Sequence, residues 1–164
     1  MSEQLMILVA GPYRGGTNDD PVLIQRNVEA MEDMALKVFR RGHLPVMGEW
    51  FALPLLKHAG SEKIGDAVFD EIFHPVAREL IGKCDAVLRI GGPSTGAGDM
   101  VATGRKLGKT IFRSLDEIPR AYSVRLESAE RNMPAATTTP VRAFPGRWNR
   151  ERFHLPGNRS SRAR

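Results

Sequence analysis

The chain has 164 residues, of which 41% are hydrophobic and 26% are charged, a composition typical of an ordinary globular protein with one folded domain. No apolar run approaches the roughly 20 residues of a membrane helix, and the residues after Met1 lack the layout of a secretion signal, so neither a membrane protein nor a secreted one is expected. Cys84 is the single cysteine and cannot form an internal disulfide, which fits a cytoplasmic protein.

The net charge of +5 is unevenly distributed along the chain. Residues 121–164 hold nine Arg, no Lys and three Glu, a net charge of +6, which leaves residues 1–120 at −1. A nucleic-acid-binding face on the body is therefore poorly supported, and binding of nucleic acid through the arginines of residues 121–164 is only a weak alternative. We predict a folded domain over 1–120 and an irregular Arg/Pro-rich tail over 121–164, which is flexible or docks on a partner subunit.

The first half of the chain alternates short apolar runs with helical patterns. Asp20 and Pro21 suit the N-cap and the first position of a helix, and apolar residues recur at helical spacing after them. The predicted elements, in order, are a buried strand at 6–10, a helix from Pro21 to a stop at Gly42, a strand at 43–47, a turn at 48–50, and a short helix with a loop over 51–65.

The second half continues the alternation. The predicted elements are a helix over 66–82, kinked at Pro75, a strand at 85–90, a helix over 97–107 and a strand at 110–112 after Gly108. Strands that alternate with helices predict an α/β fold, namely a doubly wound, mostly parallel sheet of four to five strands of the Rossmann-like or flavodoxin-like type.

Two glycine-rich turns follow two of these strands. The first is Gly11-Pro12-Tyr13-Arg14-Gly15-Gly16, and the second is Gly91-Gly92-Pro93-Ser94-Thr95-Gly96-Ala97-Gly98-Asp99, which leads into a helix. Free backbone N–H groups and the positive end of a helix favour anions, especially phosphate. Turns at the carboxyl ends of parallel strands face one crevice, so the sequence predicts a site for a phosphorylated or sugar-bearing small molecule.

The residues of these turns resemble a known family. Residues 7–16 resemble the opening strand and turn of nucleoside 2-deoxyribosyltransferase-like proteins, and the Tyr/Arg-Gly-Gly form is similar to the 2′-deoxynucleoside 5′-phosphate N-hydrolases. The stretch from Pro93 to Met100, continuing to Lys109, resembles the second motif of the same family. The resemblance covers roughly residues 5–115.

This resemblance implies a flavodoxin-like domain that forms a homodimer and cleaves the N-glycosidic bond of a (deoxy)nucleoside or its 5′-monophosphate. The reaction passes through an oxocarbenium-like sugar, and carboxyl groups stabilise that charge or protonate the departing base. The family requires no metal or other cofactor. Its nucleophilic Glu aligns with Met100, whose thioether cannot replace it, and Asp99 is the nearest carboxylate.

The candidate roles follow from the motifs and the resemblance. Asp99 and Tyr13 are the predicted catalytic residues. The predicted substrate-binding residues are Gly11, Arg14, Gly15, Gly16, Glu49, Ser94, Gly96 and Gly98. In this set Ser94 and the backbone amides after it are expected to bind a phosphate group, and the guanidinium of Arg14 to form two parallel hydrogen bonds to a phosphate. Glu49 is expected to accept hydrogen bonds from sugar hydroxyls.

Two other functions compete with N-glycoside cleavage. A catalytically inactive nucleotide-binding sensor or regulatory module would keep the phosphate cradle and lack the catalytic Glu, as Met100 indicates. A phosphoribohydrolase of the cytokinin-activating kind has a loosely similar Gly-Gly-x-Gly-Thr turn, but the acidic pair that follows that turn is missing here. NAD binding is disfavoured because the third glycine of its fingerprint is absent.

Overall fold

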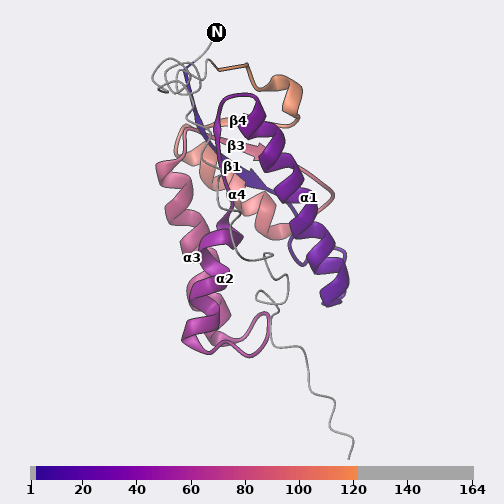
Figure 1. The fold of residues 1–164 in the computed structure, drawn as a ribbon. Coiled ribbons are helices and arrows are strands. Elements are labelled where there is room, and N and C mark those ends of the chain that lie inside the picture. The colour runs from indigo at the N-terminus through magenta and orange to yellow at the C-terminus, as the bar shows by residue number, and fades with distance from the viewer. Residues whose placement is uncertain (1–2, 122–164) are drawn as a thin grey trace, which may run out of the picture. The chain divides into compact units, whose positions relative to one another are not determined.

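The computed structural model describes residues 3–121, and the predicted tail lies outside the described residues except for Ala121. This part of the chain forms four strands and four helices, which alternate except that α2 and α3 follow one another (Figure 1). In order they are β1 (Met6–Ala10), α1 (Pro21–Arg40), β2 (Leu44–Val46), α2 (Gly48–Ala59), α3 (Ala67–Lys83), β3 (Ala86–Arg89), α4 (Thr95–Lys106) and β4 (Thr110–Phe112), followed by a 3₁₀ turn at Leu115–Glu117.

The sheet is parallel throughout, in the order β2-β1-β3-β4. The prediction of a doubly wound, flavodoxin-like α/β fold is confirmed, with four strands. The chain moves from β1 to one neighbouring position and then returns to the other side of β1, so the order reverses between β1 and β3. Open parallel sheets bind ligands at the carboxyl ends of the strands that flank such a reversal.

The two faces of the sheet are covered by different helices, which Figure 1 shows on either side of the strands. On one face, Ile7 and Val9 pack with Met31 and Val38 of α1. On the other, Leu8 packs with residues of α3 and α4 that include Ala77 and Met100. Because side chains alternate along a strand, β1 contributes to both cores and is buried on both faces.

The predicted elements agree with the structure except around residue 48. Asp20 caps α1, its carboxylate accepting hydrogen bonds from the amides of Val22 and Leu23, as the sequence predicts. The turn predicted at 48–50 is wrong, because α2 begins at Gly48 directly after Met47 and continues through Pro54. The helix α3 likewise continues through Pro75. None of the helices within residues 3–121 is long and apolar enough to cross a membrane.

A buried histidine joins the two ends of this domain. His43 is 0% exposed; its Nδ1 accepts from the amide of Leu5 at 3.1 Å and its Nε2 lies 2.6 Å from the carbonyl oxygen of Pro119. Since Nδ1 is an acceptor, Nε2 carries the proton and donates to Pro119. The imidazole therefore links the segment before β1 to the segment after the 3₁₀ turn.

Replacing His43 with alanine is expected to lower the free energy of unfolding by about 2 kcal/mol, because the fully buried imidazole and its hydrogen bonds to the part-buried amide of Leu5 and to the carbonyl of Pro119 are lost. Denaturant unfolding monitored by circular dichroism measures the change. His58→Ala is the control, since His58 is exposed, and it should change stability by less than about 0.5 kcal/mol. Equal effects of the two substitutions would contradict a linking role for His43.

Candidate functional site

The loops that follow β1 and β3 are in direct contact. A Cβ atom on Gly15 would lie 2.9 Å from the carbonyl oxygen of Pro93. Gly91 has a φ of 74°, in the left-handed region, and a Cβ there would lie 2.7 Å from Cδ of Pro12. The two glycine turns thus lie side by side at one edge of the sheet, and glycine is needed where each meets the other.

Side chains from neighbouring elements hold both loops. The guanidinium group of Arg89 donates to the carbonyl oxygens of Ile90, Gly91 and Gly92. On the other loop, the amide of Asn27 in α1 donates to the carbonyl oxygen of Tyr13 at 3.0 Å. These bonds satisfy loop carbonyls that no strand or helix would satisfy, and they fix the course of both turns.

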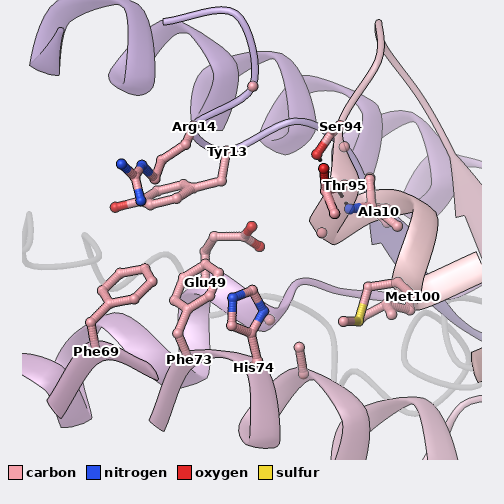
Figure 2. Close-up of a pocket in the computed structure, with 18 of the residues that line it drawn as sticks. Ala10, Tyr13, Arg14, Glu49, Phe69, Phe73, His74, Ser94, Thr95 and Met100 are labelled. Atoms are coloured by element: carbon pink, nitrogen blue, oxygen red, sulfur yellow. Dashed lines mark hydrogen bonds between the residues drawn. The ribbon is translucent and has the colours of Figure 1, made fainter. Parts of the chain in front are cut away.

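A cavity of about 360 Å³ opens at this edge (Figure 2), within the range of small-molecule sites of about 300–1,000 Å³. Seven of the ten predicted site residues line it: Gly11, Tyr13, Arg14, Gly15, Glu49, Ser94 and Gly96. The other three, Gly16, Gly98 and Asp99, are exposed and are not among its lining residues.

The register of α4 decides which of two neighbouring residues faces the cavity. Met100 is 7% exposed and lines the cavity next to Ala77, whereas Asp99 points to solvent. Consecutive helical residues project about 100° apart, so both cannot face the same wall. The position at which the resemblance expects a nucleophilic Glu is thus part of the cavity, and a thioether occupies it.

The N-terminus of α4 forms one end of the cavity. Ser94 is the N-cap: its hydroxyl accepts from the amide of Ala97 at 3.3 Å and its carbonyl oxygen accepts from the amide of Gly98 at 2.9 Å. The amides of Thr95 and Gly96 precede these two and have no partner within the helix. They lie in the cavity wall with the positive end of the helix dipole, an arrangement suited to an anion.

Aromatic rings form the opposite end. The ring centroids of Tyr13 and Phe73 are 5.1 Å apart, and those of Phe73 and Phe69 are 4.6 Å apart in a stacked arrangement. His74 follows them on α3, with its ring edge-on to that of Phe73. Figure 2 shows the rings of Tyr13 and Phe69 on one side of Glu49 and Ser94 on the other. His74 instead lies near the start of α4, because a Cβ on Gly96 would be 3.9 Å from its Cε1.

Sequence reasoning missed the contribution of α3 to this site. Five of its residues line the cavity: Phe69, Asp70, Phe73, His74 and Ala77. Positions separated by three, four and seven residues share one face of a helix, so the pattern was visible in the sequence. What the sequence did not indicate is which face of α3 turns toward the glycine turns.

Glu49 lies in the middle of the cavity. It is in the first turn of α2, only 8% exposed, and its carboxyl group points between Tyr13 and His74 (Figure 2). Within residues 3–121 no cation pairs with it. Burial therefore raises the pKa of Glu49 to about 7, although a hydrogen bond from its own backbone amide lowers it. The group changes its charge near neutral pH.

The hydroxyl of Tyr13 is a second unusual group. The side chain is 6% exposed, and its oxygen has no hydrogen-bond partner in the described part of the chain. Burial first, and then the negative charge of Glu49, raise the pKa of Tyr13 to about 12, while Arg14 lowers it. The phenol thus stays protonated and offers a donor for which residues 3–121 supply no acceptor.

Arg14 is engaged away from the helix terminus. Its guanidinium donates to both carboxylate oxygens of Asp19, at 2.5 and 2.7 Å, and this bond lowers the pKa of Asp19. In Figure 2 the guanidinium lies beyond the Tyr13 ring, on the side away from Ser94. The structure therefore does not bring Arg14 and Ser94 together around one phosphate.

No three His, Cys, Asp or Glu side chains among residues 3–121 are grouped so that they could hold a metal ion. Comparison of the sequence with protein-family models finds no match. Comparison with curated proteins likewise finds no matching relative.

Proposed function

We propose that this cavity binds a nucleoside or nucleoside 5′-monophosphate and that the protein cleaves, or transfers across, its N-glycosidic bond. The arrangement in Figure 2 carries the proposal: an anion-binding helix terminus, a buried carboxyl group and an aromatic wall follow one another along one cavity. The resemblance of the two glycine turns to nucleoside 2-deoxyribosyltransferase-like proteins supports the same chemistry.

The order of the three features matches the order of the parts of a nucleotide. A 5′-phosphate suits the amides of Thr95 and Gly96, and a base suits the rings of Tyr13 and Phe73, which offer a flat apolar surface. The sugar then lies between them, with C1′ and the glycosidic bond nearest Glu49. Cleavage of that bond generates positive charge on the sugar and negative charge on the base, and a nearby carboxyl group stabilises the first when ionised or protonates the second when neutral.

The first test is turnover by the unmodified chain. Incubation with a panel of ribo- and deoxyribonucleosides and their 5′-monophosphates should release free base, detected by liquid chromatography, from at least one of them. Exposed Asp99 allows a second comparison: a large loss of base release in Asp99→Ala would indicate that Asp99 takes part in the reaction although it does not line the cavity. No base from any member of the panel would refute the catalytic proposal.

A nucleotide-binding module without catalysis is the second candidate, and Met100 is the observation that favours it. The cavity keeps its helix terminus and aromatic wall, while the wall position in α4 carries no carboxylate. Calorimetry that finds micromolar binding of a nucleotide without base release would favour this module. Absence of binding to any nucleotide would exclude this module, and absence of binding to any nucleoside as well would exclude both candidates.

A further inference from the structure

Few carboxyl groups line the cavity. Among residues 3–121 only Glu49 and Asp70 bring a carboxyl side chain to its wall. Asp70 is exposed, whereas Glu49 is buried and directed into the cavity. Position 100, which the resemblance assigns to a nucleophilic Glu, contributes a thioether instead.

The start of α2 fixes where Glu49 lies. Met47 is fully buried and serves as the N-cap without a side-chain hydrogen bond, so α2 begins directly at the end of β2. A Cβ on Gly48 would lie 3.1 Å from Cβ of Ala77, which shows how closely the first turn of α2 approaches α3. Glu49 follows this contact and is held facing the helix terminus of α4 and the ring of Tyr13.

We propose that Glu49 is the general acid of the cleavage reaction, a role that rests on the proposed function of the cavity. The carboxyl proton passes to the nitrogen of the departing base as the C1′–N bond breaks and its electron pair stays on the base. Water then adds to C1′ and gives a proton to the Glu49 carboxylate, which returns the group to its starting form. The acid of this reaction thus comes from α2, while position 100 of α4 contributes no carboxyl group.

The surroundings of Glu49 are consistent with an acid that works near neutral pH. The charged or titratable groups that face it from the packed elements are Tyr13 and Arg14 of the first loop, and Asp70 and His74 of α3; α4 presents Met100. Arg14 is already neutralised by Asp19. With burial raising its pKa to about 7, Glu49 is still largely protonated just below neutrality, and base release should fall as the pH rises through that value.

The decisive variant is Glu49→Gln, which keeps the shape of the side chain and removes its acidic proton. We expect kcat for base release to fall by at least 100-fold, as removal of a general acid typically does, while the dissociation constant for the same nucleotide changes less than about threefold. Glu71→Gln is the matched control, because Glu71 is exposed on α3 and does not line the cavity. It should keep the activity of the parent chain.

A second readout does not depend on turnover. A buried carboxyl group whose pKa is raised by folding binds more protons in the folded state, so the free energy of unfolding falls as the pH rises from about 4.5 to 7. Glu49→Gln should remove this part of the pH dependence. Glu49→Asp, which retains an acid, should regain part of the lost activity and should show a shifted basic limb in its pH profile.

The outcomes separate the two proposals. If the parent chain releases no base, the proposed function fails and the role of Glu49 fails with it. If the parent chain is active and Glu49→Gln retains more than a tenth of its kcat, Glu49 is only part of the wall and the present inference alone is overturned. If Glu49→Gln does not fold, the test rests on Glu49→Asp. An active Glu49→Asp variant whose activity declines at the same high pH as that of the parent chain would overturn the role of Glu49 as the acid.

Discussion

Replacing Ser94 with aspartate is expected to weaken binding of a nucleoside 5′-monophosphate by at least tenfold and to leave binding of the uncharged nucleoside nearly unchanged. Aspartate caps a helix as well as serine does, so α4 should keep its N-terminus. Its carboxylate would lie next to the amides of Thr95 and Gly96, where the proposal places the phosphate. Like charges about 4 Å apart near a protein surface repel by several kcal/mol, and each 1.4 kcal/mol is a factor of ten in affinity.

Ser94→Asn is the matched control for this substitution. Asparagine is a comparable N-cap of the same shape and carries no charge, so the two variants differ only by the carboxylate. Titration calorimetry with inorganic phosphate, a nucleoside and its 5′-monophosphate compares them. Equal affinity of the Asp and Asn variants for the monophosphate would show that the phosphate does not bind at the start of α4.

The second large effect is expected at Gly91, where alanine should lower the free energy of unfolding by about 3 kcal/mol. The left-handed conformation that Gly91 adopts is unfavourable by roughly 1–2 kcal/mol for a residue with a Cβ. The new atom would also meet the rigid ring of Pro12 at 2.7 Å, and overpacking of this kind typically costs 1–3 kcal/mol. Denaturant unfolding measures the sum.

The neighbouring glycine supplies the control. Gly92 has no positive φ, and a Cβ there would meet nothing within 4 Å. Gly92→Ala should therefore change stability by less than about 0.5 kcal/mol. If both alanine variants were equally stable, the contact between the two glycine turns would not contribute to the fold as described.

The parts of the site that the sequence predicted are those with local causes. The N-cap at Asp20, the apolar strands and the glycine turn that leads into α4 each follow from residues within a few positions. The meeting of the two glycine turns followed from one further rule, that parallel strands end at the same edge. Local chemistry and sheet topology were thus enough to predict which loops form the cavity.

The remaining parts depend on how helices pack. No polar N-cap marks the start of α2, and Pro54 lies inside it, so the sequence favoured a turn where Glu49 belongs to a helix. The sequence did not place His74 in the site, because the apolar spacing of α3 does not reveal which face meets the sheet. The choice between Asp99 and Met100 required the helical register of α4 to within one residue.

The reciprocal contacts of Gly15 with Pro93 and of Gly91 with Pro12 also bear on the thermodynamics of recognition. Because each loop restricts the other before a ligand binds, the backbone of the two loops loses little further conformational entropy on binding. Such preorganisation lowers the entropic cost of complex formation. More of the interaction with a small molecule can then appear as affinity, even in a cavity with few charged contacts.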